Sequence, residues 1–574
     1  MNILGISCYY HDSSACLLQS GVITAAVAEE RFTRIKHDTS FPVNAIDFCL
    51  KEGGISIDDV DYIAFYEKPI LKFERVLSQS IEGFPKTAKL FLRSMPSWFT
   101  EKFRVPHTVK KSLGYKGDVV FIEHHLSHAA GAFLPGPYKE AAIVTIDGVG
   151  EWTTTAHGVG KGNSIELLKE INFPHSLGLF YSTMTAFLGF KVNNDESKIM
   201  ALRAYGEINR EKNEFYKKLK RVVKINDDNS FSLDMNYFNY QIGDRMPSKK
   251  LSLLLELPVR KKEEELKKEH QDIAAATQLI YEDVFFSILN YVQKETKLDN
   301  LVLSGGCAMN STANGRILEE TSFKSFWIPP DTGDGGTSLG AAYFTYFSLF
   351  NKEKERKQMK NPYLGPKTTN EEVEKFLKEN NIKYCRFKNE KELVDKTAEL
   401  IHEDNILGWF QGRMEWGPRA LGARSVLSNP CYKENKERML KIKNRESFRP
   451  LCPAVCLEDA DKYFEYEKFS SSSSNFISMV YNVRKEWADK ISAVVHQDNT
   501  VGLQTVEREY NRRYYDVIKK FGELSGIPVI INTSFNLGGE PIVNDPEVAY
   551  ECMMETKLDY LIIEDFLIKR KDNL

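Results

Sequence analysis

Two stretches of this chain, residues 2–31 and 141–171, follow the same plan, and this repeat limits the fold more than any other feature. Each opens with an apolar, β-branched run, turns through small residues and glycines, and continues into further apolar runs. Such runs bounded by turn residues are typical of β-hairpins. Two related hairpin units, each opening half of one region, predict a duplicated α/β fold. Their glycine turns can present backbone N–H groups to a phosphate from either side.

The length of the chain requires more than one hydrophobic core. With 574 residues it exceeds the size at which a single core keeps growing. Residues 361–370 begin with two prolines and a glycine in six residues, which predicts an ordered linker. We therefore expect a large domain over residues 1–360 and a separate α/β domain over residues 371–574.

Composition excludes several classes of partner. The formal net charge is −3, which gives no electrostatic footprint for nucleic acid or for an anionic membrane. The nine cysteines lack paired spacing, which suits reduced thiols rather than a disulfide scaffold. The first residues lack the basic start of a secretory leader, and no apolar run approaches about 18 residues. We expect a soluble cytoplasmic protein that binds neither nucleic acid nor a membrane.

Four residues are predicted to bind a divalent metal. His124 and His128 are four residues apart, so on a helix both imidazoles project from one face. Asp147 ends an apolar strand, where a carboxylate is costly unless a charged or hydrogen-bonding group meets it. Asp334 lies in a glycine-containing turn that opens a later helix and is the fourth expected ligand. For the histidine pair alone, ordinary capping or core histidines are the alternative.

Two further regions can bind phosphate. The apolar strand 299–304 ends in Ser-Gly-Gly before an expected helix, a junction that brings a nucleotide close to main-chain N–H groups, although such turns are common. Residues 413–449 hold ten Lys or Arg against four Glu, among glycines and aromatic residues. Arginines in such turns suit bidentate capture of phosphate, and a solvated basic face is the alternative. The strand end at 532–536 can also donate hydrogen bonds to an anion. Two such regions predict two substrates, or one intermediate made in one place and used in another.

Other segments have simpler interpretations. The stretch 67–115 is predicted to be helical, and the charged run 260–270 is predicted to be the solvated face of a helix over 262–296. Residues 225–260 are irregular and rich in aromatic side chains, so they resemble an insertion. That insertion can line an acceptor pocket or make an oligomer contact, and a homodimer stays open.

The chain resembles, over essentially its whole length, the carbamoyltransferases of the nodulation (NodU), cephamycin and aminoglycoside O-carbamoylation type. The resemblance implies a large domain of the actin, sugar kinase and heat-shock ATPase superfamily, close to the metal-dependent threonylcarbamoyl transferases, and a C-terminal YrdC-like domain. The motifs that carry it are residues 10–15, 124–129, 147–148, 176–181, 304–306, 334–336, 361–366, 413–424, 445–450 and 532–536.

The resemblance also implies a two-step reaction. In the YrdC-like domain, carbamoyl phosphate and Mg-ATP would give carbamoyl adenylate, with release of phosphate and pyrophosphate. In the large domain, a hydroxyl of a small-molecule acceptor, a sugar or natural product, would take the carbamoyl group while AMP leaves. A divalent metal, iron by family similarity, would bind the adenylate phosphate.

Each group of residues acquires a role from this resemblance. His11 would orient the carbamoyl group or accept the proton of the acceptor, because neutral imidazole is a suitable base near neutral pH. The metal ligands would be His124, His128, Asp147 and Asp334. The nucleotide or adenylate would contact Asp12, Lys198, Ser304, Gly305, Gly306 and Asn310. In the C-terminal domain, carbamoyl phosphate and ATP would be held by Arg413, Arg419, Arg424, Lys443, Arg445, Arg449, Asn532 and Ser534, with Lys443 and Arg449 as catalytic residues.

The sequence departs from the family pattern at a few positions. Gly502 stands where relatives usually carry an arginine that is a phosphate ligand, and Arg508 is close enough in sequence to substitute for it. Ser197 and Ala201 replace the usual glycines of their motif. Three other functions stay open: a kinase or ATPase that makes ADP, a binding or regulatory relative without turnover, and direct carbamoylation of a tRNA nucleoside.

Overall fold

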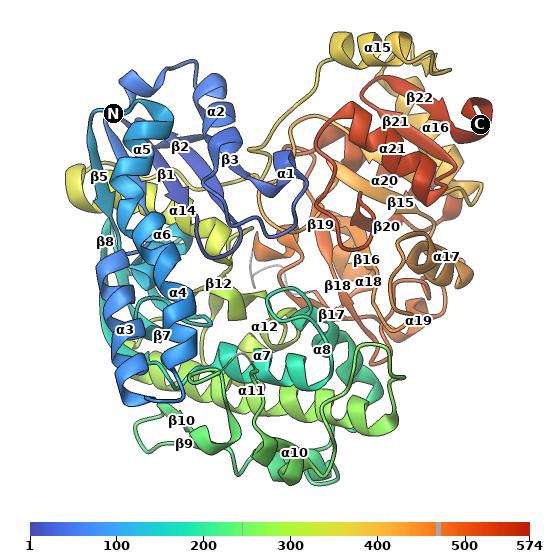
Figure 1. Cartoon of the computed structure of the whole chain (residues 1–574). Helices are drawn as coiled ribbons and strands as arrows, with labels where there is room; N and C mark the ends of the chain where they lie inside the picture. The colour runs from blue at the N-terminus through green and yellow to red at the C-terminus, as the bar shows by residue number, and fades with distance from the viewer. Residues whose placement is uncertain (244, 467–471) are drawn as a thin grey trace. The chain divides into compact units, whose positions relative to one another are not determined.

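The computed structural model describes residues 1–243, 245–466 and 472–574 (Figure 1). Two compact units can be distinguished. Unit 1 consists of Met1–Thr24 and Thr39–Gln358, and unit 2 consists of Ala25–Asp38 and Met359–Leu574. Both units combine helices with sheets, which confirms the predicted α/β class.

Unit 1 contains two sheets with the same strand order. The first runs β3-β2-β1-β4-β5 and the second β12-β11-β6-β7-β8. In the first sheet, β1 pairs antiparallel with β2 and parallel with β4, and β4 pairs parallel with β5. In the second sheet, β6 pairs antiparallel with β7 and parallel with β11, and β11 pairs parallel with β12. The predicted duplication is therefore confirmed strand by strand. The strands are β1 (Asn2–Ser7), β2 (Ser14–Gln19), β3 (Val22–Ala28), β4 (Tyr62–Phe65), β5 (Asp118–Phe121), β6 (Glu140–Ile146), β7 (Thr153–Lys161), β8 (Ser164–Asn172), β11 (Asn300–Ser304) and β12 (Ser325–Trp327).

In unit 1, one helix from each half packs against the sheet of the other half. Helix α6 (His124–Phe133) follows β5 and packs against β6 and β11, whereas α14 (Asp334–Tyr343) follows β12 and packs against β1 and β2. The two helices also pack against each other. Glycine makes this close contact possible, because a Cβ added at Gly340 would overlap the carbonyl oxygen of Ser127. The sequence therefore sets the distance between α6 and α14.

The remaining helices of unit 1 only partly follow the sequence-based expectations. Helices α3 (Pro69–Glu82), α4 (Ala88–Thr100) and α5 (Val105–Leu113) confirm the helical stretch 67–115. The long helix α11 (Lys268–Thr296) begins later than predicted, so the charged run before it is not a helix face. Arg260 in that run is buried, and its Nε donates to the carbonyl oxygen of Leu188 at 2.7 Å, which holds the segment as a loop. Other elements are α2 (Val43–Glu52), α7 (Leu177–Phe187), α8 (Glu196–Leu202), α9 (Glu214–Leu219), β9 (Val223–Ile225), β10 (Phe231–Leu233), α10 (Lys249–Leu255), α12 (Ser311–Asn314) and α13 (Ile317–Glu320).

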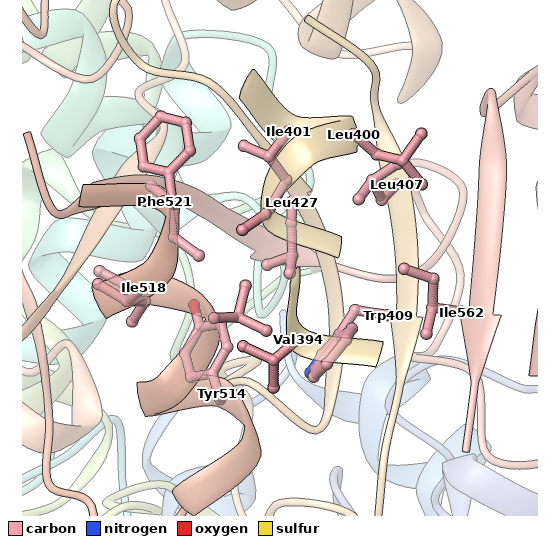
Figure 2. Packing of buried hydrophobic residues seen from close by; sticks show 14 of the residues in the cluster. Val394, Leu400, Ile401, Leu407, Trp409, Leu427, Tyr514, Ile518, Phe521 and Ile562 are labelled. Carbon is pink, nitrogen blue, oxygen red and sulfur yellow. The ribbon is translucent and has the colours of Figure 1, made fainter. Parts of the chain in front are cut away.

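Unit 2 is built on a mixed sheet in the order β13-β22-β21-β14-β15-β20-β16-β19. Helices α16 (Glu390–His402) and α20 (Arg512–Ser525) lie against it, and Figure 2 shows their shared core with Trp409 among the helix side chains. In α20 the core side chains Tyr514, Ile518 and Phe521 recur at helical spacing. The strands are β13 (Cys385–Arg386), β14 (Leu407–Phe410), β15 (Arg424–Ser428), β16 (Cys452–Cys456), β19 (Gln504–Val506), β20 (Val529–Ser534), β21 (Tyr560–Ile563) and β22 (Phe566–Lys569), beside a separate pair, β17 (Val480–Asn482) and β18 (Thr500–Gly502). Other helices are α15 (Asn370–Glu379), α17 (Glu434–Ile442), α18 (Ala460–Tyr463), α19 (Lys485–Ala488) and α21 (Pro546–Thr556).

A short N-terminal segment belongs to unit 2, which the sequence-based division did not anticipate. It contains the single-turn helix α1 (Glu30–Thr33). Arg34 donates to the carbonyl oxygens of Ile542 at 2.7 Å and Pro541 at 2.8 Å, and Arg31 donates to Gly417 at 3.0 Å. These charged side chains satisfy loop carbonyls that lie several hundred residues further along the chain.

The predicted linker also packs within unit 2. The amide of Trp416 donates to the carbonyl oxygen of Pro362 at 2.6 Å, and the amide of Gly365 donates to Met414 at 2.9 Å. Residues 361–366 are therefore ordered by main-chain hydrogen bonds to the turn that precedes β15. In the described part of the chain, no helix combines the length and apolar content needed to cross a membrane.

The contact between α6 and α14 leads to a stability prediction. Gly340→Ala should lower the free energy of unfolding by about 1–3 kcal/mol, because the new methyl group must displace main-chain atoms of α6. Thermal unfolding followed by fluorescence measures the change. Gly243→Ala is the matched control, since the nearest atom to its added Cβ is 4.0 Å away. Equal stability of the two variants would contradict the close contact.

Candidate functional site

The four predicted metal ligands lie together in unit 1. Nε2 of His124 is 3.1 Å from Nε2 of His128 and 3.3 Å from Oδ2 of Asp147. Oδ1 of Asp334 is 3.6 Å from Nε2 of His128. One ligand atom from each residue lies within 4.8 Å of the others, and all four residues are buried. The structure therefore brings together all four residues that the sequence analysis selected.

The fold explains why these side chains converge. His124 is the first residue of α6 and His128 lies one turn later on the same face. Both oxygens of Glu151 accept the amide hydrogen of His124, at 3.1 Å, and hold this end of the helix. Asp147 directly follows β6, and its Oδ1 accepts the amide of Gly306 at 2.8 Å. Asp334 is the first residue of α14, so the contact between α6 and α14 sets its distance from the histidines.

The electrostatics of this cluster favour a bound cation. Burial raises the pKa of Asp147, but its hydrogen bond with His124 and the charges of His128 and His124 lower that pKa by more. The carboxylate of Asp147 is therefore ionised. The pKa of Asp334 is also lowered on balance, by His11 and His124 against its burial. Neither oxygen of Asp334 has a hydrogen-bond partner among the described residues. A buried carboxylate without donors, next to a second buried carboxylate, is costly, and a divalent ion would relieve that cost.

The residues therefore fit the expected metal. Imidazole nitrogens and carboxylate oxygens are ligands that suit first-row ions such as iron, manganese and zinc. His125, between the two candidate ligands in sequence, faces elsewhere: its Nδ1 is 2.7 Å from Oγ1 of Thr145. Burial and the neighbouring His124 and His128 lower the pKa of His125 to about 3, so it is a neutral packing residue.

His11 lies beside this cluster on a strained loop. The loop after β1 places Tyr9 at φ 72° and Asp12 at φ 55°, in the left-handed region. Such strain is often found at functional sites. Nδ1 of His11 is 2.8 Å from Asp12, and its Nε2 is 3.7 Å from Oδ2 of Asp334. Burial lowers the pKa of His11, but Asp334 and Asp12 raise it more, to about 9. A cation on Asp334 would remove the largest of these raising effects and favour neutral imidazole.

Ser304, Gly305 and Gly306 border the metal cluster. Oγ of Ser304 is 3.5 Å from Nδ1 of His128. Gly305 has φ 89°, and an added Cβ there would overlap the carbonyl oxygen of Ile146. The expected helix after β11 is instead a short 3₁₀ turn (Gly306–Met309) followed by the single-turn helix α12. The helical structure after the junction is therefore shorter than a regular helix, and phosphate binding at this junction stays a prediction.

Two predicted nucleotide residues have structural partners. Oδ1 of Asn310 caps α12 by accepting the amide of Ala313 at 3.1 Å, and its Nδ2 donates to Gln278 at 2.9 Å. Nζ of Lys198 is 3.2 Å from the carboxylate of Asp195. Both side chains have local partners in unit 1, and their contact with a nucleotide stays a prediction.

Unit 2 contains a cluster of cations around the end of β20. Lys443 is 1% exposed, and its Nζ donates to the carbonyl oxygen of Ser534, to Oγ of Ser534 at 3.1 Å and to Oδ1 of Asn536 at 2.9 Å. Nη2 of Arg445 donates to Oγ of Ser534 at 3.3 Å. The predicted residues Lys443, Arg445 and Ser534 are therefore in direct contact.

The cations of this cluster repel one another. Burial and the charge of Arg445 hold the pKa of Lys443 well below its usual range, with contributions from Lys36 and Arg449. Burial, Arg449 and Arg419 lower the pKa of Arg445 to about 10. An anion between these groups would remove the repulsion. Lys36 comes from the N-terminal segment of unit 2, and nothing in the sequence indicated its place in the cluster.

Three residues predicted to bind phosphate donate hydrogen bonds to other residues of unit 2. Arg424 is fully buried, donates to Gln411 and Gly412, each at 3.0 Å, and lies 3.5 Å from the centroid of the Phe410 ring. Arg413 donates to the carbonyl oxygen of Gly365 at 3.1 Å. Asn532 donates to Ala420 at 2.9 Å and Gln504 at 2.6 Å. Their donors hold the loops on which the cationic cluster is built, and their contact with phosphate stays a prediction.

The position of Gly502 borders the same cluster. A Cβ there would lie 3.3 Å from Sγ of Cys452, and the pKa of Cys452, raised by burial, is lowered in turn by Arg419, Arg445 and Arg449. Arg508 does not replace the missing arginine. Its guanidinium pairs with Asp516 at 3.0 Å, and its side chain is 54% exposed.

Sequence comparison identifies the class of protein. The model of the carbamoyltransferase N-terminus matches residues 2–343, and that of the carbamoyltransferase C-terminus matches residues 398–570. The chain belongs to the carbamoyltransferase family and is a transferase.

Its relatives match over nearly the whole chain. An uncharacterized protein of Synechocystis sp. is 43% identical over 99% of this chain and 97% of its own length. The nodulation protein NolNO of Sinorhizobium fredii is 33% identical over 98% of this chain and 79% of its own length. HypF from T. kodakarensis is 12% identical with a TM-score of 0.30, over 61% of this chain and 48% of HypF. The duplicated α/β architecture of unit 1 is shown by its strand order and does not depend on that similarity.

The buried cluster leads to a metal-binding prediction. Asp334→Asn should reduce the metal content of the purified protein from about one ion per chain to a small fraction, because it removes a charged ligand without changing side-chain size. Elemental analysis by mass spectrometry measures the content and identifies the ion. His125→Gln is the matched control on α6, and it should keep the metal. Equal metal content in both variants would contradict the assignment.

Proposed function

We propose that this protein is an ATP-dependent O-carbamoyltransferase that works in two steps. Unit 2 makes carbamoyl adenylate from carbamoyl phosphate and ATP, and unit 1 transfers the carbamoyl group to a hydroxyl of a small-molecule acceptor. The observation that carries the proposal is a pair of buried sites of opposite charge: unit 1 has a buried carboxylate, Asp334, without a hydrogen-bond donor among the described residues, and unit 2 has buried cations that repel one another.

The cationic cluster suits the first step. Carbamoyl phosphate and ATP are both anionic, and Arg445, Arg449 and Lys443 can contact their phosphate oxygens as point charges and bidentate forks. In this scheme water releases phosphate from carbamoyl phosphate, and an oxygen of the resulting carbamate attacks the α-phosphorus of ATP. Pyrophosphate then leaves. The same cations would stabilise charge on the transferred and leaving groups.

The site in unit 1 suits the second step. A divalent ion held by the four ligands would supply positive charge to the adenylate phosphate as AMP leaves. Asp12 orients His11 through its hydrogen bond to Nδ1, which directs Nε2 toward the metal cluster. Nε2 of neutral His11 could accept the proton of the acceptor hydroxyl as its oxygen attacks the carbamoyl carbon.

The products distinguish this proposal from a kinase of the same superfamily. Purified protein incubated with ATP should release pyrophosphate only when carbamoyl phosphate is present, and AMP should appear when an acceptor is added. A kinase or ATPase would instead produce ADP. Formation of ADP without pyrophosphate would refute the proposal.

Separate sites for the two steps predict separable defects. Lys443→Met should lower carbamoyl-phosphate-dependent pyrophosphate release at least about 100-fold, because a buried charge that contacts the phosphate is lost. The same variant should still use pre-formed carbamoyl adenylate, whereas Asp334→Asn should show the reverse pattern. Lys441→Met, which changes an exposed lysine two residues away, is the matched control. Loss of both steps in Lys443→Met would contradict the two-site scheme.

The lowered pKa of Lys443 predicts proton-linked binding. Lys443 is charged only below its lowered pKa, and a bound anion favours the charged form. Binding of pyrophosphate should therefore take up protons, and its affinity should fall as pH rises through that pKa, below the usual value of about 10.4. Calorimetry in buffers of different ionisation enthalpy measures the uptake. Lys443→Arg should abolish it, and equal proton uptake by this variant would contradict the assignment to Lys443.

A further inference from the structure

A buried arginine in unit 1 has no acceptor for its guanidinium group among the residues that the structure describes. Helix α3 buries both Lys72 and Arg75, which are 5% and 7% exposed. Nζ of Lys72 is 2.5 Å from the buried carboxylate of Glu67. Arg75 makes no ion pair with any described residue, and its buried Nε likewise lacks a hydrogen-bond partner there. A buried, unpaired charge is costly and calls for an explanation.

The nearest carboxylates cannot supply the missing partner. Glu67 and Glu151 both act on Arg75 electrostatically. Glu67 is already paired with Lys72, and Glu151 accepts the amides of Lys68 at 2.7 Å and His124 at 3.1 Å. A further cation lies nearby: burial and the charge of Lys72 lower the pKa of Lys102 to about 8, and Arg75 contributes to that shift against the raising effects of Glu67 and Glu101. Among the described residues, none of these carboxylates makes an ion pair with Arg75.

A second unpaired donor, the amide of Gln79, and two aromatic rings lie near Arg75. Gln79 lies one turn later on the same face of α3, and its buried Nε2 has no partner among the described residues. The guanidinium of Arg75 lies 5.3 Å from the centroid of the Phe173 ring, and the ring of Tyr240 meets Phe173 edge-on at 5.9 Å. The aromatic ring stabilises the cation but accepts none of its conventional hydrogen bonds.

This group of residues is connected to the metal cluster through Tyr10. Nζ of Lys72 lies 4.8 Å over the ring of Tyr10, and Tyr10 and Arg75 interact electrostatically. The ring of Tyr10 is 4.5 Å from that of His11, whose Nε2 is 3.7 Å from Asp334. Tyr10 therefore contacts both Lys72 on α3 and His11 beside the metal cluster.

We propose that Arg75 and Gln79 bind an oxyanion, a carboxylate or a phosphate, carried by the hydroxyl compound that receives the carbamoyl group. The planar guanidinium matches either anion through two parallel hydrogen bonds, and the amide of Gln79 adds a third donor. The bound anion supplies the counter-charge that the described protein residues do not. Arg75 is thus a specificity-determining residue of the acceptor site, and this inference rests on the proposed carbamoyl transfer.

A matched pair of variants tests whether Arg75 supports the fold. In ligand-free protein, Lys72→Met leaves Glu67 buried and unpaired, so it should lower the Tm by about 2–5 °C. Arg75→Met removes a charge that has no partner, so it should leave the Tm unchanged or raise it. If Arg75→Met lowers the Tm as much as Lys72→Met does, Arg75 has a structural role and the proposal is overturned.

Acceptor preference tests the binding role. Three probes share one sugar ring: D-glucose, D-glucuronate and D-glucose 6-phosphate. With pre-formed carbamoyl adenylate, AMP release should show a kcat/KM about 10- to 100-fold higher for one of the charged probes than for glucose. Comparison of the two charged probes distinguishes a carboxylate from a phosphate. The preference should be lost in Arg75→Met and partly kept in Arg75→Lys, and exposed Lys86→Met is the control.

The failure of this inference can be separated from failure of the proposed function. Equal use of the three probes, no transfer to any of them, or a preference that survives Arg75→Met would overturn the anionic acceptor. Pyrophosphate formation from ATP and carbamoyl phosphate is measured with the same wild-type preparation. If pyrophosphate forms while the charge preference is absent, only the acceptor assignment fails; if it does not form, the proposed function fails.

Discussion

The close packing of α6 against α14 is the contact on which the candidate metal site depends. Each helix comes from one half of the duplicated unit and covers the sheet of the other half. The ligands His124 and Asp334 are the first residues of these two helices. A shift of either helix would therefore separate the histidines from one carboxylate. Gly340 permits the close approach of the two helices. A residue without a side chain therefore controls the distances between the candidate metal ligands.

Duplication also explains why the cluster is asymmetric. The two helices have the same length and equivalent positions, but one begins with a histidine and the other with an aspartate. The other carboxylate, Asp147, follows β6, whereas the residue that follows β1 in the first half is Cys8. The duplicated fold thus supplies two equivalent helix ends. Because different side chains occupy them, the two candidate ligands differ in charge and hardness. This combination of nitrogen and oxygen ligands is suited to a first-row metal.

The sequence predicted those features that depend on local spacing. The interval from His124 to His128 indicates one face of a helix, and an aspartate after an apolar strand indicates the end of that strand. The segment around Lys36 could not be predicted, because its place in unit 2 depends on hydrogen bonds to loops far along the chain. The partners of Arg424 could not be predicted for a related reason. Motif position shows that an arginine is near the site, but only the structure shows that main-chain carbonyls accept hydrogen bonds from its Nη atoms.

Missing partners distinguish the functional side chains from the framework. Arg424 and Lys72 are as deeply buried as the candidate site residues, yet both Nη atoms of Arg424 and Nζ of Lys72 have acceptors inside the protein, and only Nε of Arg424 has none among the described residues. Asp334 and Arg75 carry atoms that lack such partners among the described residues. Burial removes water from both kinds of group at a similar cost, so only the unpaired ones gain from a ligand. The sign of each unpaired charge then supports the proposed ligand, a cation for Asp334 and an anion for Arg75. Lys443 has acceptors, and there it is the mutual repulsion of the surrounding cations that supports the proposed binding of phosphate groups.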